Sequence, residues 1–418
     1  SDQRCIGRCR RGSVRAAWLP RARLSMMRSY SKVSLSAITA TAMGTGTFLI
    51  VVASVLAAEL IEAFGITRAQ VGLLVTSFGV VGGLLSPLLG RFTDRIGAVR
   101  ATRGVFTAGA IAMTGVALAP AYPILIVAAL ATGVANGWCN PATNLLIVDN
   151  LEPGQRGVVT GIKQSGVQIT AFLAGLILPT VAAVWSWRIA VLMLLVMPIG
   201  ALAAMTRRES RPHIGAASAD AAGGSVPASV RWIAVYGAVS GFATSGVFVF
   251  IALFAEEDQS WSPQAAGVLL GIVGLVGVAA RVVWPQVSER RLGHGPTLRL
   301  LGGLSMMSSL ILAIAATRGI PAWLLVVSAI LLGAGSVAWN AVGMLAVMDL
   351  SPQGAVGRGT GAVLLGFLLG TALGTPLLGL SVDLVGSYGP GWISVTVLHA
   401  VTILIALKIP AGSTQPVS

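Results

Sequence analysis

The segment from Gly90 to Arg100, which reads GRFTDRIGAVR, is the most informative part of this sequence. It places four charged side chains, among them Asp94, between two apolar stretches that begin near Gln70 and Ala101. Each stretch is long enough to cross a membrane, which takes about 20 mostly apolar residues. A short basic loop between two such stretches is expected at a membrane surface.

The same spacing recurs 195 residues later, with one extra residue before the last glycine. Gly90, Asp94, Arg95 and Gly97 correspond to Pro285, Glu289, Arg290 and Gly293. A second set of identities recurs at an offset of 200, in which Gly133, Asn140, Asp149, Gly157, Thr160, Gly161 and Gly166 match Gly333, Asn340, Asp349, Gly357, Thr360, Gly361 and Gly366. Such repeats indicate a duplication in the same orientation, with an axis along the membrane normal.

The composition excludes a soluble protein. Of 418 residues, 55% are hydrophobic and only 10% are charged, and the mean hydropathy is +0.85. Soluble enzymes, disordered chains and disulfide-linked scaffolds have more polar sequences than this one. No metal or other cofactor is expected, because the cysteines and histidines are few and scattered: Cys5, Cys9, Cys139, His213, His294 and His399.

Twelve apolar stretches of membrane-spanning length can be counted. They begin near Val33, Gln70, Ala101, Pro123, Gly157, Arg188, Arg231, Gln264, Thr297, Pro321, Gly357 and Gly389. The sequence thus predicts an all-α polytopic membrane protein with twelve transmembrane helices in two six-helix lobes, residues 33–206 and 231–408. Residues 207–230 are expected to form a flexible linker between the lobes, and residues 409–418 a C-terminal tail.

The distribution of basic residues predicts the orientation in the membrane. If the N-terminus is cytoplasmic, 23 of the 28 Lys and Arg residues lie on the cytoplasmic side, and Arg68, Arg188 and Arg318 lie on the other. This asymmetry follows the positive-inside rule, so both termini are expected in the cytoplasm, with the protein in the plasma or inner membrane. The net charge of +14 then belongs to one membrane face, and nucleic acid is not expected as a partner.

Residues 1–32 form a basic tail. They include nine basic residues and one acid, Asp2, and no apolar run of signal-peptide length. A transit peptide has a similar composition. We expect instead an unstructured extension, because Met26 and Met27, followed by a short basic stretch, would be a sufficient beginning.

In these features the chain resembles the major facilitator superfamily over about residues 33 to 408. The resemblance rests on the twelve stretches, on a Ser-Trp-Arg sequence that opens the sixth stretch, and on the family's loop signature, matched by Gly90, Asp94, Arg95, Gly97 and Arg100. It implies a secondary transporter, not an enzyme, that works by alternating access as a monomer in the lipid bilayer. It does not identify the small-molecule substrate, because one scaffold carries many.

The resemblance also implies a role for the loop signature. In the family the acid of this loop lies against the start of the eleventh helix, here Gly357, where a helix N-terminus favours an anion by about 0.3–1 kcal/mol. We expect Asp94 to latch a cytoplasmic gate in this way, and the repeat predicts that Glu289 lies against Gly157. The alternative is that Asp94 and its neighbour Arg95 are solvated loop charges.

In this family the first, fourth, seventh and tenth helices line the central cavity, and here each carries polar residues at helical spacing. These residues are Thr41 and Thr45, then Asn136, Asn140 and Asn144, then Tyr236, Ser240 and Thr244, and finally Ser336 and Asn340. Because polar side chains are costly in lipid, we expect them to face water and a substrate. Hydrogen bonding between helices is the alternative.

Two cations lie inside predicted spans. Lys163 is about 9 Å inside the fifth span and Arg281 about 12 Å from Glu289, at 1.5 Å per residue, and the acids cluster at span ends. An unpaired cation costs at least about 2.5–3.5 kcal/mol near the bilayer centre. Lys163 with its neighbour Gln164, and Arg281, are therefore predicted to bind a small organic or inorganic anion. Alternatively, Lys163 reaches Asp149 and Arg281 reaches a helix carbonyl.

Two other functions stay open. A proton-coupled drug exporter of this family often has an Arg on the fourth span, where this chain reads AALATG over residues 128–133, and a further glycine on the fifth, where Thr170 stands. A membrane receptor could use the same fold without translocation. Both sequence features count against the exporter, so anion transport is favoured.

Overall fold

The computed structural model describes residues 30–66, 68–205, 226–261, 263–318, 320–352 and 354–412. The expectations for the N-terminal tail up to residue 29, for most of the linker and for the last six residues lie outside this part of the chain. Within the described ranges, the regular elements are all helices.

The helices form two sets of six membrane crossings within those ranges. The first set is α2 (Lys32–Val55) with α3 (Ala57–Phe64), α4 (Arg68–Ile96), α5 (Ala98–Leu118), α6 (Tyr122–Asn150), α7 (Arg156–Val184), and α8 (Trp187–Met193) with α9 (Val196–Met205). The second set is α11 (Ala228–Glu257), α12 (Pro263–Val287) with the π-helical turn η1 (Ser288–Leu292), α13 (His294–Ala315), α14 (Ala322–Ala334) with α15 (Trp339–Leu350), α16 (Val356–Val385) and α17 (Gly389–Ala406).

The twelve predicted spans are confirmed. By length and composition, ten of the crossings in the described residues can span a membrane. The helices α7 and α11, with 29 and 30 residues, complete the set. Each crossing begins within three residues of the start predicted from the sequence.

Glycine closes both copies of the repeated loop. Gly97, between α4 and α5, has φ 84°, and Gly293, between η1 and α13, has φ 81°. Glycine adopts positive φ without the steric cost that a Cβ brings. The repeated motif therefore ends in a glycine in both halves because each loop makes the same turn.

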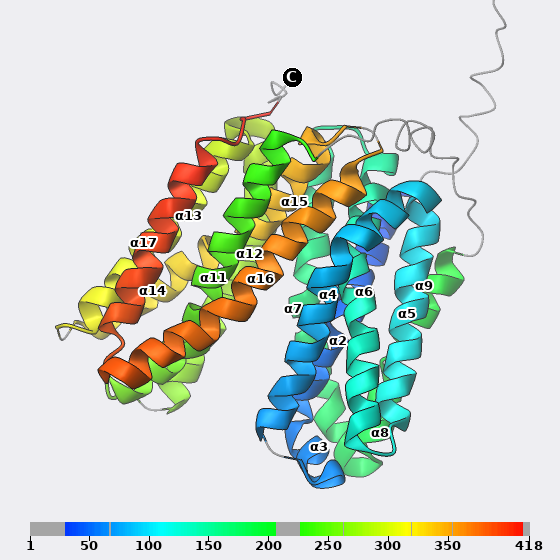
Figure 1. The fold of residues 1–418 in the computed structure, drawn as a ribbon, viewed down its shortest axis with the longest axis horizontal. Coiled ribbons are helices and arrows are strands. Elements are labelled where there is room, and N and C mark those ends of the chain that lie inside the picture. Colours follow the sequence, from blue (N-terminus) through cyan, green and yellow to red (C-terminus); the bar gives the residue numbers. More distant parts are fainter. Residues whose placement is uncertain are drawn as a thin grey trace, which may run out of the picture.

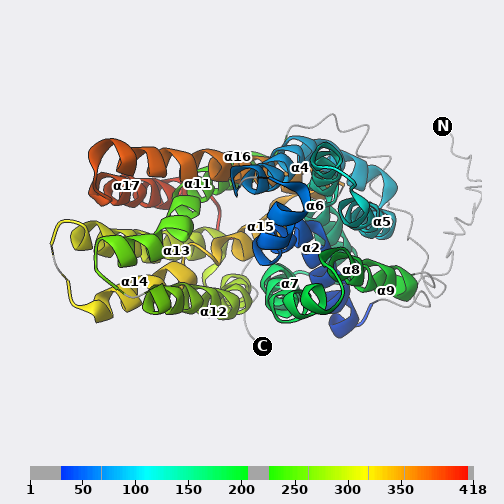
Figure 2. The same ribbon diagram turned by 90° about the horizontal axis from the view of Figure 1, so that it is seen from below.

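The two lobes lie side by side and touch mainly through two equivalent helix pairs, α4 with α16 and α7 with α12. Figure 2 shows one pair on each side of the junction. In Figure 1 the lobes approach each other where α16 begins and diverge where it ends. We call the first end, which holds Asp94, Glu289 and Arg358, the motif end.

Glycine lets the helices that join the lobes approach closely. A Cβ on Gly161 of α7 would lie 2.5 Å from the carbonyl oxygen of Arg281 in α12. Its repeat partner, Gly361 of α16, faces Ser86 and Pro87 of α4 in the same way. Small residues at such positions permit close packing of membrane helices, so these two glycines set the distance between the lobes.

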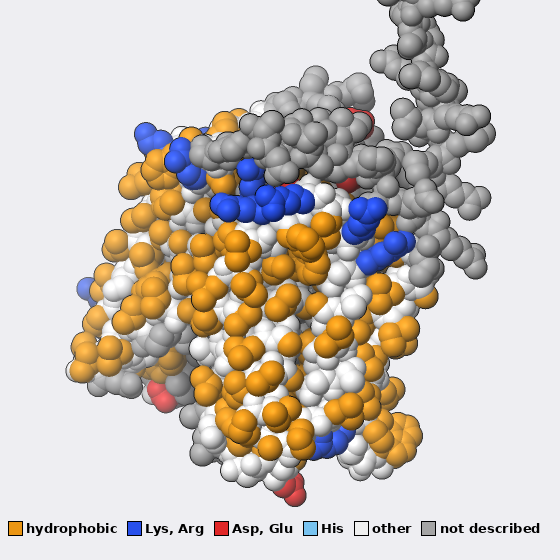
Figure 3. All heavy atoms as spheres, turned by 45° about the vertical axis from the view of Figure 1, so that its right-hand side comes forward, with side chains coloured by type: hydrophobic (Ala, Val, Ile, Leu, Met, Phe, Trp, Pro, Cys, Tyr) orange, Lys and Arg blue, Asp and Glu red, His pale blue; other side chains and the backbone are white. Residues whose placement is uncertain are grey.

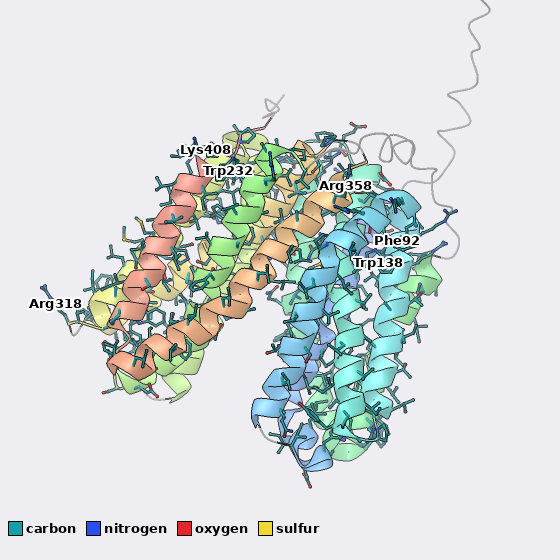
Figure 4. All side chains as sticks on the ribbon, in the orientation of Figure 1. Phe92, Trp138, Trp232, Arg318, Arg358 and Lys408 are labelled. Carbon is teal, nitrogen blue, oxygen red and sulfur yellow. The ribbon has the colours of Figure 1, made fainter. Side chains whose placement is uncertain are left out.

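The surface visible in Figure 3 fits a bilayer. Most of its area is hydrophobic, and most of its Lys and Arg side chains gather near the motif end. Figure 4 places Arg358 and Lys408 at this end and Arg318 at the other. An apolar belt between charged ends is the surface that a multi-pass membrane protein requires.

Candidate functional site

Asp94, in the last turn of α4, caps the first turn of α16. Its Oδ1 accepts a hydrogen bond from the Gly357 N–H at 2.8 Å, and its Oδ2 accepts one from the Arg358 N–H at 3.0 Å. The side chain is 1% exposed, so the bonds are shielded from water. The contact is the one that the sequence predicts, whereas its role as a gate stays a prediction.

Glu289 makes the equivalent contact from the second lobe to the first. Its Oε1 accepts from the Arg156 N–H and its Oε2 from the Gly157 N–H, both at 2.9 Å. The two lobes are thus joined at the motif end by two carboxylates that each satisfy backbone donors at a helix N-terminus.

A partly buried ion pair, not predicted from the sequence, lies beside the second cap. Nη1 of Arg156 is 2.6 Å from Oδ1 of Asp349, and Nε2 of His294 is 3.3 Å from Oδ2 of the same carboxylate. His294 is the buried first residue of α13. Because Arg156 and Asp349 belong to different lobes, this pair strengthens the closure of the motif end.

The other predicted gate residues differ in their surroundings. Gly90 faces the backbone of Gly357, where a side chain would clash. Arg95, Arg100 and Arg290 expose their side chains at the motif end. The loop signature therefore contributes one buried carboxylate, one close helix contact and several surface cations.

Lys163 of α7 is fully buried, and its ammonium donates to Oδ1 of Asn144 in α6. Nδ2 of Asn144 in turn donates to Oγ1 of Thr360 in α16, at 2.9 Å, across the junction of the lobes. Within the described residues Lys163 has no carboxylate partner, so the predicted alternative of a contact with Asp149 is not what the structure contains. A neutral amide solvates the charge without cancelling it.

A row of amides continues from this contact along α6. Nε2 of Gln164 donates to Oδ1 of Asn140 at 3.2 Å. Oδ1 of Asn136 is buried without a hydrogen-bond partner, and so is Oδ1 of Asn340 in the second lobe. Buried polar atoms are usually paired, so these two oxygens are positions that a ligand or water can satisfy.

Arg281 of α12 is 9% exposed, and only part of its guanidinium group is hydrogen-bonded. Its Nε donates to the Val337 carbonyl at 2.9 Å, whereas its buried Nη1 has no partner. A main-chain carbonyl thus satisfies one nitrogen of Arg281, but Val337 lies between α14 and α15 and not within a helix. Gly161 packs on the Arg281 backbone, and Lys163 is two residues further along α7, so the two cations come from the same contact between the lobes.

The carbonyl that Arg281 uses is free because the tenth crossing is broken. The helix α14 ends at Ala334 and α15 begins at Trp339, with Gly335 at φ −96° and ψ −81°. Within the break, Ser336 bonds to His399 of α17 at 3.2 Å. Non-helical backbone at membrane depth occurs where it lies within protein or lines a cavity, and broken helices often mark transport sites.

His399 also bonds to Ser309 of α13 at 3.2 Å, so it connects α13 to the break in the tenth crossing. In the described residues, no group of His, Cys, Asp and Glu side chains could hold a metal ion.

In the part of the chain that the structure describes, three of the predicted cavity residues make no hydrogen bond to Lys163 or Arg281. Tyr236 packs on Trp339, with ring centroids 5.5 Å apart, and its hydroxyl donates to the Leu298 carbonyl at 3.1 Å. Thr41 lines a side pocket of about 380 Å³ between α2, α7, α8 and α9. Ser240 is buried on α11. Helical spacing predicted that these residues share helix faces, but not what those faces contact.

Comparison with known proteins agrees with this architecture. The model of the Major Facilitator Superfamily matches residues 35–363. The hexuronate transporter of Bacillus subtilis (strain 168) is 24% identical over 132 residues, which are 32% of this chain and 31% of that protein. The uncharacterized transporter y4wD of Sinorhizobium fredii (strain NBRC 101917 / NGR234) is 33% identical over 82 residues, 19% of this chain and 22% of that protein. The alignments thus span less than a third of either relative.

Solved structures are similar over nearly their whole length. The proton:xylose symporter XylE bound to 6-bromo-6-deoxy-D-glucose has a TM-score of 0.74 at 15% identity, covering 91% of this chain and 96% of its own. FucP in the outward conformation scores 0.71 at 12% identity, covering 91% and 98%. The human organic anion transporter MFSD10 scores 0.66 at 16% identity, covering 90% and 98%. At such identities the likeness shows the fold alone. The family match over most of the sequence, with twelve membrane crossings in two lobes of the described residues, shows that the chain belongs to the major facilitator superfamily of membrane transporters and is not an enzyme.

Proposed function

We propose that this protein is a secondary transporter of a small anion, working by alternating access as a monomer in the plasma or inner membrane. The observation that supports an anionic substrate is the pair of buried cations at the junction of the lobes. Lys163 has a neutral partner, and Arg281 has a free Nη1, and neither has a carboxylate partner in the described residues. A bound anion would offset the cost of burying both charges.

The polar surroundings support an organic anion with further hydrogen-bonding groups. The unpaired amide oxygens of Asn136 and Asn340 accept hydrogen bonds, so they suit hydroxyl groups of a substrate. The hexuronate transporter among the relatives handles a compound that combines a carboxylate with hydroxyls. A hydroxylated carboxylate is therefore the substrate class we favour.

The basic residues support an orientation with the motif end in the cytoplasm. In that orientation the two carboxylate caps and the Arg156–Asp349 pair close the cytoplasmic side, while the lobes diverge toward the outside (Figure 1). The arrangement then corresponds to an outward-facing state.

The proposal also bears on coupling. The carboxylates that join the lobes, Asp94, Glu289 and Asp349, lie at the motif end and not beside Lys163 or Arg281. Any coupled proton would therefore travel with the substrate or on an acid at the end of a span.

The experiment is uptake into proteoliposomes that contain the purified protein. The panel should include glucuronate and simple carboxylates, the matched neutral sugar glucose, and amphipathic cationic drugs. Saturable uptake of carboxylates, inhibited by other anions and not by glucose, is expected. Movement of the cationic drugs alone would instead favour the exporter, and binding without uptake of any compound would favour the receptor.

A further inference from the structure

Asn144 lies at the pseudo-twofold axis that relates the two lobes. It corresponds to Met344 in the repeat, 200 residues later, and the two residues meet, with Nδ2 of Asn144 3.5 Å from Sδ of Met344. Two equivalent positions can touch only near the axis that relates them. Asn144 is 0% exposed, so this contact is part of the surface that must separate when the lobes rock at the motif end.

Only one of the two hydrogen bonds that the repeat could place at the axis is present. Thr160 and Thr360 are equivalent in the repeat, but Thr360 accepts from Asn144, whereas Oγ1 of Thr160 is buried without a partner. The methionine that stands in the place of a second asparagine cannot donate to Thr160. A single neutral hydrogen bond therefore joins α6 to α16 at this point.

Lys163 determines which way the carboxamide of Asn144 points. An ammonium only donates, so it must take the amide oxygen, and the NH₂ group is then directed to Thr360. Without Lys163 the amide could turn over, because a threonine hydroxyl donates as well as accepts. The repeat has Val363 in the place of Lys163, so only one lobe carries this orienting charge.

We propose that Lys163, Asn144 and Thr360 form an axial lock, in which Lys163 positions Asn144 for its bond to Thr360, and that an anion binding to the Lys163 ammonium releases it. The release step rests on the proposed function, whereas the lock itself does not. An ammonium binds a carboxylate more strongly than it binds an amide. Substrate binding would thus withdraw the orienting contact and weaken the junction that has to open.

The test measures the conformational equilibrium without substrate. Leu73, near the start of α4, and Val385, at the end of α16, are both exposed. Spin labels on cysteines at these two positions report the distance between the lobes at the end opposite the motif end. The native cysteines are replaced first. Thr360→Val removes only the bond across the axis, and we expect a roughly fivefold shift toward the state that is open at the motif end, the equivalent of one neutral hydrogen bond.

Thr160→Val is the matched control, because it removes an equivalent hydroxyl that has no partner. We expect it to leave the equilibrium unchanged, and we expect Thr360→Ser, which restores the hydroxyl, to behave like the wild type. Equal populations in Thr360→Val and Thr160→Val would overturn the lock.

Two substitutions of Lys163 separate its charge from its hydrogen bond. Lys163→Met removes both and should shift the equilibrium in the same direction as Thr360→Val but less far, because a carboxamide that turns over can still accept a hydrogen bond from the Thr360 hydroxyl. Lys163→Gln keeps an N–H donor, one bond shorter, and should shift the equilibrium least. Both should lose anion selectivity if the proposed function is right. If Lys163→Met shifts the equilibrium but neither the wild type nor any variant transports an anion, the proposed function is wrong and the lock is retained. No shift in Lys163→Met would remove Lys163 from the lock.

Glucuronate added to the wild-type protein tests the release step. It should move the distance distribution in the same direction as Thr360→Val, and it should move it no further in Thr360→Val itself, where the lock is already absent. An unchanged distribution in the wild type, under conditions where glucuronate is transported, would overturn the release step alone.

Discussion

Asp94 and Glu289, 195 residues apart in the sequence, each hold two backbone N–H groups at the start of a helix in the opposite lobe. All four bonds lie between 2.8 and 3.0 Å. Carboxylates are favoured at helix N-termini, and these two are shielded from water. The repeat supplies this contact between the lobes twice, so both caps must break when the motif end opens.

Asp94→Asn should therefore slow transport. A carboxamide has one acceptor oxygen, so one of the two N–H groups loses its partner together with the charge, a loss of about 1.5–3 kcal/mol for a bond to a charged group. The state closed at the motif end should become roughly ten- to hundredfold less favoured. Initial uptake rates in proteoliposomes and the spin-label distances measure the two effects.

Glu152→Gln is the control for this substitution, because Glu152 is an exposed acid between α6 and α7. Insertion and yield should match the wild type in both variants. Wild-type uptake in Asp94→Asn would show that the repeated geometry of the cap has no role in gating here.

The glycines between the lobes give a second prediction. Gly161→Ala adds a Cβ 2.5 Å from a backbone oxygen in α12, and Gly361→Ala does the same against α4, so each should hold the lobes apart and disfavour closure of the motif end. Gly271→Ala in α12 is the control, since nothing lies within 4 Å of a Cβ there. If all three variants give the same spin-label distances, the close approach at Gly161 and Gly361 does not determine the distance between the lobes.

The sequence predicted the fold because its signals are local and repeated. Span length, loop charge and the two copies of the motif are properties of short segments, and the offset of 195 residues is enough to pair Asp94 with Glu289. The partners of both carboxylates followed from the same pairing, since the family resemblance supplied one contact and the repeat supplied the other.

The partners of the buried cations could not be predicted in the same way. Lys163 and Asn144 are on different helices, and the sequence does not say which faces of α6 and α7 meet. The break between α14 and α15 is also hidden, because residues 331–340, which read LLGAGSVAWN, contain no proline or charged residue that would mark the end of a helix. Tyr236 packs in the apolar cluster around Trp339, a contact that helical spacing alone did not indicate.

The orientation in the membrane gives a third prediction. Arg318 lies at the end opposite Arg358 and Lys408 (Figure 4), so a cysteine in its place should react with a membrane-impermeant maleimide added outside intact cells. A cysteine at Arg290, which is exposed at the motif end, should react only after permeabilisation, and a reporter fused after Ser418 should respond as cytoplasmic. The reverse labelling pattern would invert the topology and move both caps to the outside.

Charge selection gives the last prediction, and it follows from two cations with no acid beside them in the part of the chain that the structure describes. Lys163→Gln and Arg281→Gln should each remove a charge-assisted contact of about 1.5–3 kcal/mol with an anion, which is roughly a ten- to hundredfold loss of affinity. Binding of glucose or a cationic drug should not weaken. Arg318→Gln is the control, since that cation is exposed at the far end of the second lobe.

Competition assays against anionic and neutral panels measure the effect directly. If instead the two cations only satisfy Asn144 and the Val337 carbonyl, their substitution should lower yield or thermal stability without changing which compounds compete. That outcome separates an effect on folding from an effect on selectivity. An unchanged preference for anions in both variants would contradict the proposed anionic substrate, but not the assignment of the transporter fold.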